Sequence, residues 1–283
     1  MKLEYDDEFI IIITLIFTPI IIFSTILHHL FPEVLQVPST LGPYFIEPIW
    51  LDLVIMDIST AIMAIIVIYH GFKTQGKFKT TCFLYGSILF AGLEECHWIL
   101  SGRFNLTPDK TYFFTRGGLW FIEIPVYTCL AWFILAWCCN YVSEVIFPSR
   151  NYPFHACIAG LLAVSLDLWM DPVMVNIGSA SIYPNSKGLW VWLADPKDTL
   201  SIFSIPFFNF LGWFLVIFTF LMLFGYILDD NKIEIHGKTK SAFIFFGLII
   251  VFIGITGIIL IVVNFLINPW LRGVDLIPIK LLF

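Results

Sequence analysis

Two aspartates, Asp167 and Asp171, lie four residues apart in a segment whose other side chains are largely apolar. In a helix this spacing places both carboxyls on one face. Burying a carboxyl in membrane hydrocarbon is costly, so an acid kept there is functional by default. Desolvation also favours the neutral acid, which can then deliver a proton near neutral pH. The pair therefore indicates acid–base chemistry inside a membrane.

Other polar residues recur inside or beside apolar segments. The candidates for catalysis are Asp167, Asp171, Glu94, Glu95, Glu123 and His97, and the candidates for substrate binding are Asn209, Trp213, Trp190, Trp192, Arg103 and Arg116. Each class also has a structural interpretation: His97 could satisfy a neighbouring carbonyl, the arginines could anchor to lipid headgroups, and the tryptophans could form an aromatic belt.

The chemistry of such acids depends on what an apolar pocket can hold. A strongly apolar substrate offers few groups to protonate, but a carbon–carbon double bond is one, and its protonation gives a tertiary carbocation. Aromatic faces stabilise cations. Acids and aromatic walls together suit hydration, isomerisation or cyclisation of an isoprenoid double bond. The same acids would also suit a proton-coupled carrier or a lipid binder.

The composition defines the setting of these residues. The chain has 283 residues, of which 59% are hydrophobic and 13% charged, and its mean hydropathy is +0.91. These values predict an integral membrane protein with a single membrane domain over residues 1–283. The net charge of -6 is thinly spread, and without a basic block we expect no nucleic-acid partner. The six cysteines lie in apolar segments and are interpreted as small hydrophobic residues.

Apolar runs predict the elements that position the acids. We expect an all-α, polytopic membrane protein with about seven transmembrane helices, at residues 9–31, 48–71, 81–102, 117–147, 153–178, 205–228 and 242–267. A tilt, or a kink near Pro125, would accommodate the long fourth helix. The loop over residues 179–204 is amphipathic and is expected to lie in the membrane interface or fold back over the bundle. No internal repeat is evident.

This topology places the polar residues at one depth. The third and fifth helices run away from the amino-terminal side of the membrane, and their acids come late: Glu94, Glu95 and His97 in the third, Asp167 and Asp171 in the fifth. The second, fourth and sixth helices run back, and their polar residues come early: Asp52 and Asp57, Glu123, and Asn209 and Trp213. The expected layer lies roughly 5 to 12 Å inside one membrane face.

The orientation of the chain is less strongly specified. Eight Lys and Arg residues fall on the amino-terminal side and seven on the other, so the positive-inside rule barely decides. The compact lysine loop after the second helix favours a cytoplasmic amino terminus, and the expected location is the cell membrane.

Three short motifs carry a family resemblance. Asp167-Leu-x-x-Asp171-Pro172, Trp190-x-Trp192 and Pro206-x-x-Asn209-x-x-Gly212-Trp213 together resemble the signature of the membrane carotenoid hydratases, the family of bisanhydrobacterioruberin hydratase and related carotenoid biosynthesis proteins. The resemblance covers the third to sixth expected helices. It implies that water is added to a terminal double bond of a long isoprenoid or carotenoid to give a tertiary alcohol. No metal or redox cofactor is expected, because hydration needs neither.

Roles follow as hypotheses. Asp171 or Glu94 would be the general acid, Asp167 would be the base that positions water or shares the proton, and Glu123 and His97 would tune the pair. Asn209 would orient water or a carboxyl, while Trp190, Trp192 and Trp213 would shield the cation. The expected partners are a long apolar isoprenoid or carotenoid and membrane lipid. The alternative function is a non-enzymatic isoprenoid or lipid binder, or a proton-coupled carrier.

Overall fold

The computed structural model describes residues 4–31, 50–104, 112–114, 117–176, 189–192, 200–203, 205–271, 274 and 276. These residues form the helices α1 (Tyr5–Leu30), α2 (Trp50–Thr74), α3 (Gly76–Arg103), α4 (Val126–Ile146), α5 (Tyr152–Asn176), α6 (Phe207–Ile227), α7 (Asp230–His236) and α8 (Lys238–Leu271). They also form the short strands β1 (Tyr112–Phe114), β2 (Trp120–Phe121), β3 (Ile124–Pro125), β4 (Trp190–Trp192), β5 (Ser201–Ile202) and β6 (Ile205–Pro206). The prediction of an all-α polytopic membrane protein is confirmed.

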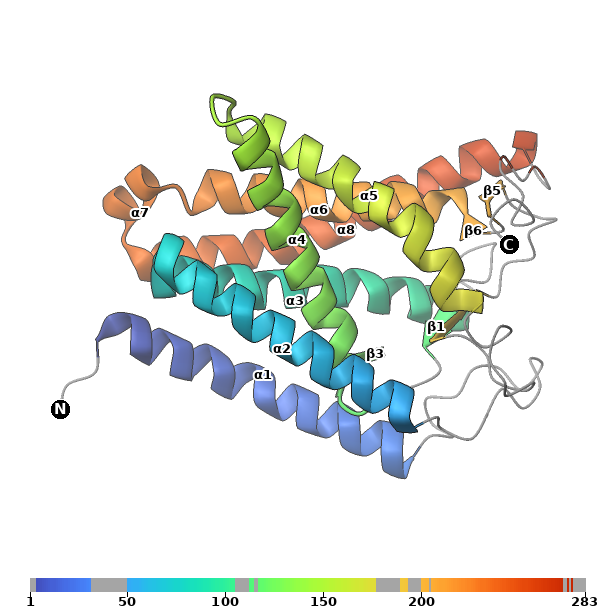
Figure 1. The fold of residues 1–283 in the computed structure, drawn as a ribbon, viewed down its shortest axis with the longest axis horizontal. Helices are drawn as coiled ribbons and strands as arrows, with labels where there is room; N and C mark the ends of the chain where they lie inside the picture. The colour runs from blue at the N-terminus through green and yellow to red at the C-terminus, as the bar shows by residue number, and fades with distance from the viewer. Residues whose placement is uncertain are drawn as a thin grey trace.

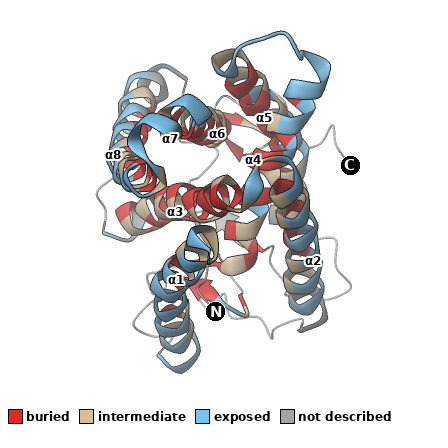
Figure 2. Ribbon diagram, turned by 90° about the vertical axis from the view of Figure 1, so that its left-hand side faces the viewer, coloured by how far each residue is buried: buried red, intermediate tan, exposed pale blue. Residues whose placement is uncertain are grey.

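Helices α3, α6 and α8 lie roughly along the longest axis of the molecule, α1, α2 and α5 are inclined to it, and α4 crosses it most steeply (Figure 1). Among the described residues, six helices are long and apolar enough to cross a membrane: α1, α2, α4, α5, α6 and α8. The remaining long helix, α3, carries Lys77, Lys79, Glu94 and Glu95. It packs against α1, α2, α4, α6 and α8 and lies in the middle of the bundle (Figure 2), so its neighbours separate its polar groups from lipid.

Aromatic side chains fill the centre of the bundle. Phe83 of α3 is almost fully buried and packs edge-on against Phe133 and Trp137 of α4 and against Phe220 and Phe224 of α6. Edge-to-face pairs add to the free energy gained by burying the rings. This packing fixes α3 between α4 and α6, the three helices from which much of the site below is built.

The fourth helix begins later than its apolar run predicts. Residues 117–125 form a β2–β3 hairpin, and α4 starts at Val126 with Pro125 as its N-cap, so Pro125 starts the helix and does not kink it. A proline disfavours helical backbone at the residue before it, which explains the boundary. The sixth helix likewise starts at Phe207, two residues later than predicted, after the β5–β6 hairpin and Pro206.

The described part of the long loop folds back over the bundle. Strand β4 pairs antiparallel with β1, so that Tyr112 faces Trp192 and Phe114 faces Trp190. The remaining residues of this loop, 177–188, 193–199 and 204, lie outside the described part. The β1–β4 pair brings two tryptophans to the ends of α3 and α5, where the acids are located.

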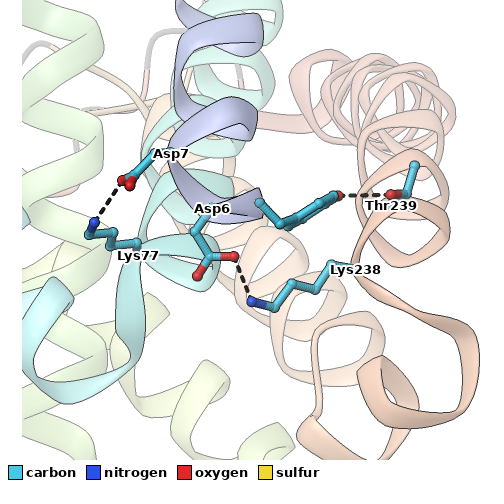
Figure 3. A network of polar contacts seen from close by, with 6 residues as sticks. Asp6, Asp7, Lys77, Lys238 and Thr239 are labelled. Carbon is cyan, nitrogen blue, oxygen red and sulfur yellow. Dashed lines mark hydrogen bonds and ion pairs between the residues drawn. The ribbon is translucent and has the colours of Figure 1, made fainter. Parts of the chain in front are cut away.

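An ionic cluster joins the helices at the opposite end. The Lys77 ammonium contacts the Asp7 carboxyl at 2.6 Å and the Lys238 ammonium contacts the Asp6 carboxyl at 2.5 Å (Figure 3). Lys79 pairs with Asp230 at 2.7 Å. These pairs join the first turns of α1, α3, α7 and α8.

Candidate functional site

Among the described residues, Asp171 accepts more side-chain hydrogen bonds than the other acids of the site. It lies late in α5, is buried, and accepts hydrogen bonds from the indole N–H groups of Trp190 and Trp192 in β4, the second at 3.3 Å. The Trp-x-Trp motif therefore places both indoles on this one carboxyl. Because residues two apart in a strand point to the same face, the Trp-x-Trp spacing lets both indoles reach this one carboxyl.

Asn209 connects the two aspartates. It lies in the first turn of α6, and its amide nitrogen donates to Asp167 at 2.9 Å and to Asp171 at 3.0 Å. The second oxygen of Asp167 is buried without a hydrogen-bond partner among the described residues. One neutral amide thus holds two carboxyls together, an arrangement that favours a shared proton over two full negative charges.

Glu94, which is buried, and Glu95, which is half-buried, contribute two more carboxyl groups from α3. Glu94 accepts a hydrogen bond from the Thr256 hydroxyl of α8 at 3.1 Å, and Glu95 accepts one from the Trp132 indole of α4 at 3.0 Å. Each keeps one buried oxygen without a partner in the described part of the chain. Threonine and tryptophan are neutral donors, so these contacts orient the carboxyls without compensating a charge.

Two adjoining cavities connect these acids. The larger, of about 130 Å³, is lined by Asp171, Glu95 and Asn209, by the methionines Met56, Met170 and Met174, and by aromatic rings. The smaller, of about 40 Å³, is lined by Glu94, Glu95, Asn209, Trp98 and Phe208 among others. The two share Glu95, Tyr112, Trp132, Trp192, Asn209 and Trp213.

The larger cavity reaches the outer surface of the bundle. Ala131 of α4 lines it and is also exposed, while Thr128 and Leu135 lie on the same face of the helix. The flexible side chains Met56 and Met170 flank this opening from α2 and α5, and methionine adapts readily to irregular ligands. An apolar molecule could enter from the membrane without passing through water.

Several predicted site residues lie away from the cavities. Glu123 is buried in the turn of the β2–β3 hairpin, not in α4, and it lines neither cavity. His97 lies against Gly257 of α8, where an added Cβ would come within 2.6 Å of the ring, and also lines neither cavity. Of the predicted common layer, the structure brings together Glu94, Glu95, Asp167, Asp171, Asn209 and Trp213, and Trp190 and Trp192 join them from β4.

The remaining polar predictions have other outcomes. Asp57 of α2 accepts a hydrogen bond from the Gly118 backbone, so it supports the β2–β3 hairpin. Arg116 and the side chains of Arg103 and Asp52 lie outside the described residues.

Tertiary structure adds residues that sequence reasoning missed. Trp132, Tyr112, Thr128 and Thr256 contact the acids or line the cavities, although none belongs to a motif recognised in the sequence. Of these, Trp132 could have been found from the sequence: it lies seven residues after an Ile-Pro dipeptide, as Trp213 does. The rings of these two tryptophans lie 4.4 Å apart, between centroids, in the shared wall of the cavities.

Comparison with known proteins agrees with the motif-based expectation. The family model described as "Carotenoid biosynthesis protein" matches residues 111–277, which is more than half of the chain. This range contains the aspartates, β4 and Asn209, but begins after Glu94, Glu95 and His97. Searches of curated proteins and of solved structures gave no match. The chain is therefore an integral membrane protein that belongs to the carotenoid biosynthesis protein family.

Proposed function

We propose that this protein adds water across a terminal carbon–carbon double bond of a carotenoid or related long isoprenoid, giving a tertiary alcohol. The observation that carries the proposal is the cavity bordered by Asp171 and Glu95, two carboxyls on different helices with an aromatic wall between them. Membership of a carotenoid biosynthesis family supports the substrate class.

Asp171 is the proposed general acid. It lines the larger cavity and its two indole donors and Asn209 hold it in place. Its proton moves to the inner CH carbon of the terminal isopropylidene double bond, and the electron pair of that bond forms the new C–H bond. The adjacent carbon becomes a tertiary cation. Asp167 lines neither cavity, so it is assigned a positioning role through Asn209 and not direct contact with substrate.

Glu95 is the proposed base. It borders both cavities and has one unpartnered oxygen among the described residues. A water molecule attacks the cation, its oxygen forms the new C–O bond, and its proton passes to the Glu95 carboxylate. Transfer of that proton from Glu95 to Asp171, across the cavity that both acids line, restores the starting state. One water is consumed per double bond.

The aromatic wall would protect the cation before water reaches it. Trp132, Trp192 and Trp213 all line both cavities, and their π faces attract positive charge. The cation–π contribution is about 2 kcal/mol at a desolvated site. A second effect of the wall is to keep other nucleophiles out.

The direct test is incubation of the purified protein with acyclic carotenoids in water enriched in ¹⁸O. Incorporation of one labelled oxygen as a tertiary alcohol is expected, and Asp171→Asn should abolish it. Failure to label any acyclic carotenoid or shorter isoprenoid would contradict the proposal. Proton-dependent uptake into vesicles with no change in ligand mass would instead favour the carrier.

We also propose that the amino terminus is cytoplasmic and that the membrane is the cell membrane. The lysine-rich end of α3 then lies on the cytoplasmic side, and the cavities lie near the opposite face. Cysteine-accessibility labelling at the α7 end in intact cells tests this orientation.

A further inference from the structure

The described chain contains two copies of one structural unit. The first runs α3, β1, β2–β3, α4, and the second runs α5, β4, β5–β6, α6. Their single strands pair antiparallel with each other, and both hairpins place a left-handed residue at the turn, Ile122 with φ 55° and Phe203 with φ 52°. Each hairpin is also closed by the same backbone bond, from the first residue of the helix to Leu119 or Leu200.

The amino-acid sequence carries a weak trace of the same repeat. At one constant offset the identical pairs include Leu119 and Leu200, Ile124 and Ile205, Pro125 and Pro206, Leu130 and Leu211, Trp132 and Trp213, and Phe133 and Phe214. Thr128 then matches Asn209, and Ala131 matches Gly212. The repeat is not evident on inspection of the sequence, because the shared backbone geometry is far clearer than the sequence similarity.

The two cavities are counterparts under this repeat. The larger one is lined by Tyr127, Thr128, Ala131, Trp132 and Leu135 of α4, and the smaller one by Phe208, Asn209, Gly212, Trp213 and Val216 of α6, which are the matched residues in order. From the preceding helix, the larger cavity takes Met170, Asp171 and Met174, and the smaller takes Glu94, Glu95 and Trp98, at identical spacing. Glu95 is thus the counterpart of Asp171.

The counterparts have diverged in chemistry. Where the larger cavity has Met170 and Met174, the smaller has Glu94 and Trp98, which makes it more polar and narrower. Glu94 is only 3% exposed, and one of its oxygens has no partner among the described residues. A buried polar atom of this kind is normally satisfied by ordered water, and the smaller cavity, of about 40 Å³, has room for it.

We infer that the duplicated cavities divide the two reactants between them: the methionine-lined cavity beside Asp171 binds the isoprenoid end, and its counterpart beside Glu94 and Glu95 binds the water. This inference rests on the proposed hydration. It assigns Glu94 a specific role, to hold and orient the water that Glu95 deprotonates. The shared wall of Trp132 and Trp213 is where the two reactants meet.

Matched substitutions in the two copies test the division. Gly212→Ala adds a methyl group to the smaller cavity, where the nearest atom, on Leu260, lies at 3.6 Å and leaves room for it. Ala131→Val adds bulk at the matched position of the larger cavity. Glu94→Met introduces the side chain that the larger cavity has at the matched place. Carotenoid affinity is read from the change in its absorption spectrum on binding, and turnover from ¹⁸O incorporation.

Glu94→Met is expected to lower turnover about 100-fold, the size of loss that follows when a reactant is misplaced, with carotenoid affinity unchanged. Gly212→Ala should reduce turnover severalfold, also at unchanged affinity. Ala131→Val should weaken affinity. Weakened carotenoid affinity in Glu94→Met or Gly212→Ala would overturn the division, since the smaller cavity would then bind isoprenoid as well. If the wild-type protein hydrates nothing, the proposed function fails, whereas the affinity measurements still report which cavity holds the isoprenoid.

Discussion

The two ends of the helix bundle treat acids in opposite ways. At the end where α1, α3, α7 and α8 begin, Asp6, Asp7 and Asp230 each contact a lysine (Figure 3). At the other end, the hydrogen-bond donors to the four site acids include the neutral side chains of Trp132, Trp190, Trp192, Asn209 and Thr256, and within the described residues no lysine or arginine contacts them.

This difference separates acids that stabilise the fold through ion pairs from acids that can transfer a proton. A carboxylate beside a lysine is held in its charged form and is a poor proton donor. A buried carboxyl with only neutral donors has no such compensation, so the protonated form is accessible and the group can exchange a proton with a ligand. Burying such a carboxyl destabilises the protein, so its presence indicates a function. The charge balance around an acid is therefore the feature that the following predictions test.

The largest effect is expected for Asp171→Asn. Hydration should fall roughly 10² to 10⁴-fold, the range for loss of a general acid or base. Turnover by ¹⁸O incorporation is the measurement, with monodispersity in detergent as the check on folding. The matched control is Asp7→Asn at the ionic end, which should keep full turnover. Equal losses in both variants would remove the distinction between the two ends.

Asn209→Ala should lower turnover roughly 10- to 100-fold, because one hydrogen bond to a charged group contributes about 1.5–3 kcal/mol. The amide bridges Asp167 and Asp171, so its loss frees both carboxyls at once. In a double variant with Asp167→Asn the two losses should not add, since both act through the same bridge. Additive losses would show that Asp167 acts independently of Asn209.

The two indole donors should differ in importance. Trp190→Phe and Trp192→Phe keep an aromatic ring but remove the N–H, and the Trp192 bond, at 3.3 Å, is the longer of the two. We expect several-fold lower turnover for Trp190→Phe and a smaller loss for Trp192→Phe. Steady-state rates of the two variants in parallel would check this order, and the reverse order would contradict the geometry.

The smallest effect belongs to the ionic end. Lys238→Ala removes a partly exposed ion pair with Asp6, and such pairs contribute roughly 0–1 kcal/mol. Thermal unfolding in detergent should begin at a slightly lower temperature, with turnover unchanged, and added salt should reduce the difference. A loss of turnover without a loss of stability would mean that this end takes part in the reaction.

Much of the architecture could be predicted from the sequence. Uninterrupted apolar runs located seven long helices, because hydrocarbon requires about 20 apolar residues per span. The spacing of Asp167 and Asp171, and the order of turns around them, also predicted that the acids would gather with Asn209 and the Trp190 and Trp192 motif. Periodicity could not locate the hairpins, since residues 117–125 are as apolar as the helix they precede and only the backbone restriction before Pro125 separates them.

The sequence by itself determined the membrane setting, the helices and the identity of the acids, because these follow from composition and from the high cost of burying a carboxyl in hydrocarbon. Only the tertiary structure decided which acids share a cavity. Glu95 and Asp171 lie on different helices, and it is the packing of these helices that places both acids in one cavity. It also separated Glu123 and His97 from the cavities, and it revealed the repeat. Backbone geometry and side-chain packing preserve such a relationship when few residues remain identical.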